Sequence, residues 1–210
     1  MLYLRYVSYL ALCMALFTAS AGAFDDFFRA VRTDNTRTVT DLLVRGFDPN
    51  THDESGQSAL TLAVREDATQ VLNVLLKHPH LDVNALNRAG ETALMLAALK
   101  GDLALARRLA EHGAAINQPG WNALHYAATG PEPQVVAWLL ERGAALDARS
   151  PNGTTALMMA ARYGNERSAE LLLAKQASAD ARNERGLTAA DFARAAGREA
   201  LAQRLDSRLR

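Results

Sequence analysis

Residues Asn87 to Asn117 read NRAGETALMLAALKGDLALARRLAEHGAAIN and contain two short helical patterns separated by a Gly-Asp turn. In each pattern, leucines and alanines recur at the spacing of one helix face. Thr92 is placed to cap the first helix with its hydroxyl, and Gly113 follows the second helix where a left-handed residue is expected. Neither helix is long enough to be stable alone in water, so the pair needs neighbours on both sides.

The turn before the first helix recurs along the chain. It is marked by glycines spaced 34, 30, 33 and 33 residues apart, namely Gly56, Gly90, Gly120, Gly153 and Gly186. Two residues after each glycine comes a side chain that can cap a helix, and then an alanine. Self-similarity at this period is typical of a stacked solenoid.

The repeating unit resembles the ankyrin repeat, whose pattern runs G-x-T-P-L-H-x-A-A-x-x-G and later L-L-x-x-G-A-x-x-N. The best matches are GETALMLAALKG, GWNALHYAATG and GTTALMMAARYG, with the tails EHGAAIN and ERGAALD. The Pro of the family's T-P-L-H is Ala in every unit, and this leaves the fold prediction intact because Ala is the best helix former. The resemblance covers Phe24 to Leu205. It implies an all-α solenoid of helix-turn-helix units with β-hairpin fingers, in about six units with degenerate end caps: approximately 24–53, 54–87, 88–118, 119–150, 151–183 and 184–210.

The first 23 residues differ from the repeats. Arg5 is their only charge, a mostly apolar run of 11 residues follows from Val7, and the small residues Ala21-Gly22-Ala23 end the segment. This pattern predicts a signal peptide over 1–23, a mature domain over 24–210, and a periplasmic or secreted protein. The alternative is that the segment is retained and tethers a scaffold to the membrane. The single cysteine lies within the apolar run, so the mature chain would have no thiol.

Repeat four and the two end units depart from the pattern. Only Gln118 and Pro119 separate Asn117 from Gly120, which predicts a finger three residues short and a weak joint in the array. In the first unit, Phe27 and Phe28 are expected to close the end of the core, and in the last unit a solvated capping helix is predicted to carry Arg198, Arg204, Arg208 and Arg210.

The sequence contains none of the common catalytic motifs. It has no G-x-S-x-G, Gly-rich phosphate loop or H-E-x-x-H, and its 23 basic and 23 acidic residues form no basic stripe. We therefore expect no enzymatic activity, no cofactor, no metal and no nucleic-acid partner. The alternative left open is a metal-dependent stress-related protein that uses His78, His80 and His112, although their spacing enforces no metal geometry.

Several side chains with chemical potential have a structural explanation. His125 occupies the His of the family's T-P-L-H, and the resemblance implies that it makes hydrogen bonds between repeats. Met95, Met158 and Met159 lie on first-helix positions and are predicted to pack in the core, as is Trp138 on a second helix.

The resemblance implies a non-enzymatic protein-binding module. Proteins of this family bind other proteins through a concave face built from finger tips and first-helix residues, and we expect a monomer with no membrane contact after signal cleavage. Transferred unit by unit, the predicted face consists of Gln57, Arg65, Glu66, Arg88, Glu91, Leu99, Lys100, Trp121, Thr129, Arg149, Asn152, Thr154, Arg162, Tyr163 and Arg182. Trp121 has two interpretations: an anchor for the partner at the floor of the notch left by the short finger, or a cover over core that the missing residues would have hidden.

Overall fold

A computed structural model describes residues 22–209, so the predicted signal peptide lies outside the described residues except for its last two positions. The chain forms two compact units, one ending at Asp82 and the other beginning at Val83. The first unit contains a helix over 22–32, then α2 (Thr36–Val44), α3 (Ala59–Arg65) and α4 (Thr69–Leu76). Phe27 and Phe28 are buried in this unit, as the sequence predicted.

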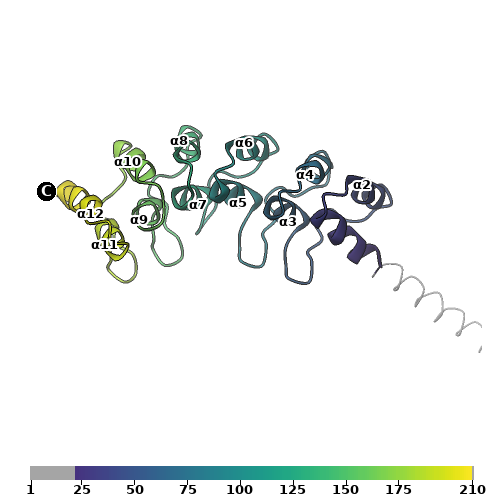
Figure 1. The fold of residues 1–210 in the computed structure, drawn as a ribbon, viewed down its shortest axis with the longest axis horizontal. Helices are drawn as coiled ribbons and strands as arrows, with labels where there is room; N and C mark the ends of the chain where they lie inside the picture. Colours follow the sequence, from purple (N-terminus) through teal and green to yellow (C-terminus); the bar gives the residue numbers. More distant parts are fainter. Residues whose placement is uncertain (1–21, 210) are drawn as a thin grey trace, which may run out of the picture. The chain divides into compact units, whose positions relative to one another are not determined.

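The second unit consists of four helix pairs in two layers (Figure 1). The inner layer contains α5 (Ala93–Lys100), α7 (Ala123–Thr129), α9 (Ala156–Arg162) and α11 (Ala189–Ala195), each packed on the next. The outer layer contains α6 (Leu103–Glu111), α8 (Pro133–Glu141), α10 (Glu166–Ala174) and α12 (Glu199–Asp206), followed by a 3-10 turn over Ser207–Leu209. The all-helical repeat architecture predicted from the sequence is confirmed.

The helix boundaries follow from the capping residues. Thr92 accepts a hydrogen bond from the Met95 N–H at 3.3 Å, and Thr155 and Thr188 occupy the same position before α9 and α11. Gly113 has a φ of 91°, as expected of a left-handed residue after a helix. Short helices are thus closed at the residues that the sequence pattern indicated.

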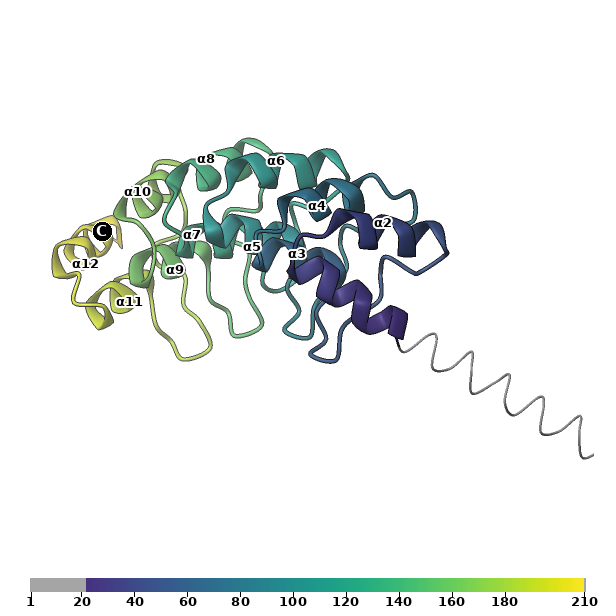
Figure 2. The same ribbon diagram turned by 45° about the vertical axis from the view of Figure 1, so that its right-hand side comes forward.

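The fingers are tight turns, and the predicted β-hairpins are not confirmed. In the second unit, the Asn87 N–H donates to the Glu91 carbonyl at 2.9 Å, and the Asn183 N–H donates to the Leu187 carbonyl at 3.1 Å. Both asparagine side chains also accept a backbone N–H inside the turn. Because each turn closes within five residues, it leaves no room for a ladder, and the one bridge among residues 22–209 is isolated, in the first unit. The loops of the second unit extend from the inner-helix side (Figure 2).

An asparagine side chain that recurs in the repeat pattern joins successive repeats. The Asn84 side chain donates to the Gly113 carbonyl at 3.1 Å and accepts the Ala115 N–H at 2.8 Å. Asn117 makes the same pair of bonds to residues 143 and 145, at 2.9 and 2.8 Å. This side chain is the N of the G-A-x-x-N tail, so that part of the repeat pattern encodes a contact between repeats.

The turn between the helices of each pair approaches the inner helix of the preceding pair closely. A Cβ added to Gly130 would lie 2.7 Å from the Leu99 carbonyl oxygen, and one added to Gly164 would lie 1.8 Å from the Ala128 carbonyl oxygen. At the last pair an arginine makes this contact: Arg198 donates to the carbonyls of Ala160, Ala161 and Gly164 at 3.0, 3.3 and 2.6 Å.

The prediction that Arg198 belongs to a solvated helix was therefore wrong. Its half-buried guanidinium satisfies carbonyls at the C-terminal end of α9, where a positive charge also complements the helix dipole. Arg204, by contrast, is exposed and pairs with Glu166 and Glu170 on α10, as a surface residue should.

Candidate functional site

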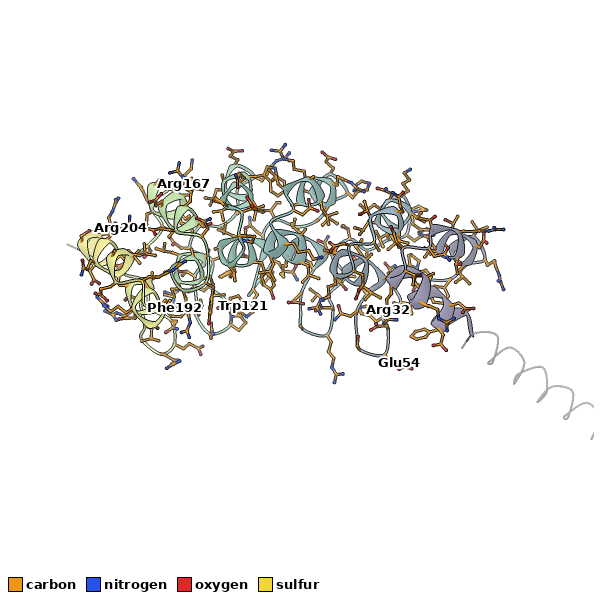
Figure 3. All side chains as sticks on the ribbon, in the orientation of Figure 1. Arg32, Glu54, Trp121, Arg167, Phe192 and Arg204 are labelled. Carbon is orange, nitrogen blue, oxygen red and sulfur yellow. The ribbon has the colours of Figure 1, made fainter. Side chains whose placement is uncertain are left out.

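The inner helices of the second unit present a set of large side chains on the side from which the fingers extend. Six residues after the turn glycine, Tyr126, Met159 and Phe192 occupy equivalent positions, and all three are only partly buried. Trp121 and Phe192 both lie on this side in the stick view (Figure 3). We call the set the inner face, and it consists of Leu99, Trp121, Tyr126, Thr129, Met159, Arg162, Tyr163 and Phe192.

An apolar hollow lies in the middle of the inner face. It has a volume of about 250 Å³, is half open to solvent, and is lined by Leu99, Trp121, Tyr126, Thr129 and Met159. The lining comes from three successive inner helices and from the short finger of repeat four, so the hollow depends on the stacking of repeats.

Trp121 forms the finger wall of the hollow. It follows Gly120, whose φ of 81° is in the left-handed region, and its ring packs against the ring of His125 edge to face, with 5.2 Å between centroids. The indole is partly exposed. Trp121 therefore packs over a buried histidine while part of its indole stays exposed, and its role as an anchor for a partner stays a prediction.

His125 lies beneath Trp121 and is a structural residue, as predicted. Its Nε2 faces the Thr154 carbonyl oxygen of the next repeat at 3.0 Å, and this ring nitrogen must carry the proton because a carbonyl only accepts. Its Nδ1 accepts the Asn122 N–H in the capping box of α7. Burial lowers the pKa of His125, and the hydrogen bonds to the carbonyls of Thr154 and Ala148 oppose that shift only in part. The buried ring therefore favours its neutral form more than a free imidazole does.

Hydrogen bonds fix two of the side chains that line the hollow, Tyr126 and Thr129. The Tyr126 hydroxyl donates to Glu91 Oε1 at 3.0 Å, and the Asn87 side chain donates to Glu91 Oε2 at 2.7 Å. The Thr129 hydroxyl donates to the His125 carbonyl at 2.9 Å. These bonds satisfy the hydroxyl donors of Tyr126 and Thr129 within the fold, so the wall of the hollow is mostly apolar.

Arg162 lies at the edge of the inner face. Its guanidinium carbon is 5.1 Å from the ring centre of Tyr163 and 6.0 Å from that of Phe192. Within residues 22–209 no carboxylate pairs with it. Tyr163 is 56% exposed, and Leu99 on the hollow is 37% exposed; they are two of the four large hydrophobic side chains that are exposed among the described residues.

The other predicted site residues divide by environment. Arg149 donates to the Arg182 carbonyl at 2.9 Å and so links two neighbouring fingers, whereas Arg182 donates to the Gly186 carbonyl of its own finger at 2.7 Å. Thr154 is only 2% exposed, so its side chain is not available to a partner. Its backbone N–H donates to the Ser150 hydroxyl, and its carbonyl accepts a hydrogen bond from His125. The exposed members elsewhere on this unit are Arg88, Lys100 and Asn152, and the first unit contains Gln57, Arg65 and Glu66.

Sequence reasoning missed three members of the inner face. Tyr126 and Phe192 were not predicted, and Met159 was predicted to be core, although it lines the hollow; Met95 and Met158 are buried as predicted. The signal was a large apolar residue at the same place in every unit, six positions after the turn glycine. That position also suits a core residue, and the choice between the two depends on what packs over it.

The histidines give no support to a metal site. Across the described chain, no three His, Cys, Asp or Glu side chains are grouped so that they could hold a metal ion. His78 and His80 have ring centres 5.9 Å apart, whereas the His112 ring bonds to the Arg108 carbonyl of its own helix at 2.8 Å.

Comparison with known families agrees with this geometry. The model of the ankyrin repeats (3 copies) family matches residues 27–119, 72–150 and 124–205. The chain belongs to the ankyrin repeat family. Ankyrin repeats are protein–protein interaction scaffolds, and the inner face of this ankyrin-repeat chain carries aromatic rings, aliphatic groups and an arginine, which are groups common at protein interfaces.

Known proteins share parts of the ankyrin-repeat chain. Protein glp-1 of Caenorhabditis elegans is 32% identical over 157 residues, which cover 67% of this chain and 12% of that protein. SH3 and multiple ankyrin repeat domains protein 2 of Homo sapiens is 34% identical over 139 residues, which cover 63% of this chain and 7% of that protein. The chain thus spans a small fraction of either relative.

A solved structure is similar over almost its whole chain. It belongs to the complex of the Bd0816 predatory endopeptidase of Bdellovibrio bacteriovorus with immunity protein Bd3460. The TM-score is 0.72 at 25% sequence identity, and the match covers 87% of this ankyrin-repeat chain and 97% of the solved chain.

No helix within residues 22–209 is both long and apolar enough to cross a membrane.

Proposed function

We propose that this chain is a non-enzymatic, monomeric ankyrin-repeat module that is exported to the periplasm and binds a protein partner through the inner face of its second unit. The observation that carries the proposal is the half-open apolar hollow, whose wall includes the exposed Leu99. Binding energy at protein interfaces concentrates in aromatic and arginine side chains set in such surfaces. The outer helices of the unit expose charged side chains such as Arg107, Glu141 and Arg167.

The binding face can be tested by site-specific photo-crosslinking in the native host. A photo-reactive phenylalanine replaces Tyr163 in one variant and Arg167, an exposed residue of α10, in a matched control. We expect a covalent adduct with one defined protein from position 163 and none from position 167. Adducts from 167 alone would place the interface on the outer helices and refute the proposal.

The export component rests on the N-terminal sequence and has its own test. Mass spectrometry of the protein from fractionated cells should find a chain that starts at Phe24 in the soluble periplasmic fraction. A protein that starts at Met1 in the membrane fraction would instead support the tethered scaffold.

The structural comparison favours one specific form of partner binding. A chain of nearly the same extent comes from a complex between an endopeptidase and an immunity protein, so a peptidase is a candidate partner. If this chain restrains a peptidase, its addition in excess to the host's periplasmic fraction should slow hydrolysis of fluorescent casein. An unchanged rate at saturating excess would contradict this candidate and leave the general binding proposal in place.

A further inference from the structure

We propose that the inner face recognises an acidic segment of its protein partner, which inserts one bulky apolar side chain into the hollow and places a carboxylate on Arg162. This inference rests on the proposed function, because it assumes that the inner face is the binding face. It adds the chemistry of the segment that is bound.

The size of the hollow fits a single large side chain. A closed cavity of about 150 Å³ is sufficient to bind benzene, and this half-open hollow measures about 250 Å³. Its walls come from Trp121, Tyr126 and Met159 together with Leu99 and Thr129. The hydroxyls of Tyr126 and Thr129 already donate to other groups, so an apolar group is the better occupant.

Arg162 provides the charge that this apolar group needs beside it. It follows Met159 by three residues on α9, so the two side chains lie on one helix face, next to each other. The guanidinium lies over the rings of Tyr163 and Phe192, at distances that allow a cation–π contact with each. A planar, pre-positioned guanidinium without a carboxylate partner among residues 22–209 is suited to a bidentate bond with an aspartate or glutamate from another molecule.

The charge of the whole face favours the same partner. In the finger and inner-helix segments of the second unit, 86–100, 118–130, 149–163 and 182–196, there are seven basic and three acidic residues. The rest of residues 83–209 contains eight basic and ten acidic residues, so the basic excess belongs to this side. Two of the acidic groups, Glu91 and Asp191, and three of the basic groups, Arg149, Arg182 and Arg194, are engaged in hydrogen bonds within the fold, so the excess remains basic. Such a surface steers and retains an acidic partner.

The test uses a displayed library of random 12-residue peptides selected on the purified full chain. We expect the enriched peptides to combine one large apolar side chain with flanking Asp or Glu. For the best peptide, labelled with fluorescein, Arg162→Glu should raise the Kd at least tenfold. Arg167→Glu makes the same change of charge on the outer helix α10 and should alter the Kd less than twofold. If Arg162→Glu lowers the thermal midpoint, Arg162→Gln replaces it, with the same expectation.

Other results would overturn the inference in distinguishable ways. Enriched peptides with basic or neutral flanks that still lose binding in Leu99→Ser would refute the acidic segment and retain the inner face as the binding site. Binding that tolerates both Leu99→Ser and Arg162→Glu would refute the inference and the proposed function together. Displacement of the peptide by a 12-nucleotide single-stranded DNA would assign the basic face to nucleic acid, and the absence of any enrichment would also count against the inference.

Discussion

Replacement of Gly164 by alanine should destabilise the second unit through one defined contact between repeats. The added Cβ would lie 1.8 Å from the Ala128 carbonyl oxygen and 3.0 Å from its carbonyl carbon. An ordinary carbon–oxygen contact is about 3.3 Å, so two packed backbones would have to separate by about 1.5 Å. Overpacking of this kind costs about 1–3 kcal/mol or more, and the restriction of the unfolded chain returns about 0.4–1 kcal/mol. A separation of about 1.5 Å places this site at the upper end of the overpacking cost, so we expect a net loss of about 2 kcal/mol or more in the free energy of unfolding.

The assay is urea unfolding followed by far-UV circular dichroism, with Gly143→Ala as the control. Gly143 has a φ of 80° and no atom within 4 Å of an added Cβ, so this control measures the left-handed backbone alone. Gly164 has no positive φ, so its substitution measures the close approach alone. If Gly164→Ala costs no more than Gly143→Ala, the turns do not stack on the preceding inner helix as described.

Three further predictions concern other contacts in the second unit. The pKa of His125 is lowered in the folded state, so the unfolded chain binds this proton more tightly and the free energy of unfolding should fall as the pH drops below about 6.5. In the same urea assay, a His125→Gln variant should lose less stability than the parent chain between pH 7.5 and 5.5. An equal loss in both would contradict the assignment. Arg198→Ala should lower the free energy of unfolding by about 2 kcal/mol because charged hydrogen bonds to three carbonyls disappear. Arg204→Ala removes only an exposed ion pair and should cost less than about 1 kcal/mol. Equal losses by thermal unfolding would refute the capping role of Arg198. The buried Ser168 hydroxyl has no hydrogen-bond partner among the described residues, so Ser168→Ala should leave stability unchanged or raise it by about 1 kcal/mol, and a clear loss would show that this hydroxyl is satisfied in solution.

The repeat architecture could be predicted from the sequence because local rules and the global fold agree. Thr92, Gly113 and Pro133 each encode a helix boundary through capping, a left-handed backbone or a fixed φ, and the structure places all three where those rules put them. The buried leucines and alanines follow from the helical period. These properties depend only on residues close in sequence and recur in every unit.

The exposure of individual side chains on the proposed binding face could not be predicted in the same way, because it depends on packing between neighbouring repeats. The position occupied by Met159 and Tyr126 is buried at Leu96, one or two repeats earlier, although all three residues are large and apolar. Thr154 resembles an exposed finger residue in sequence, yet it is buried, and its carbonyl bonds to His125 of the preceding repeat.

The role of Arg198 shows the same limit. An arginine in a terminal, charge-rich helix is typical of a solvated surface, and only the approach of that helix pair to α9 brings three carbonyls within reach of its guanidinium. The short finger of repeat four was visible in the sequence, but the hollow beside it requires walls from three repeats.

The most direct test of the central claim is hydrogen–deuterium exchange on the chain with and without the partner captured at position 163. If the inner face binds the partner, protection should increase in the last turns of α5, α7 and α9, which contain Leu99, Thr129 and Arg162, and in the Trp121 finger. Exchange in α6, α8 and α10 should stay unchanged. Protection confined to those outer helices would contradict the assignment of the inner face as the binding surface.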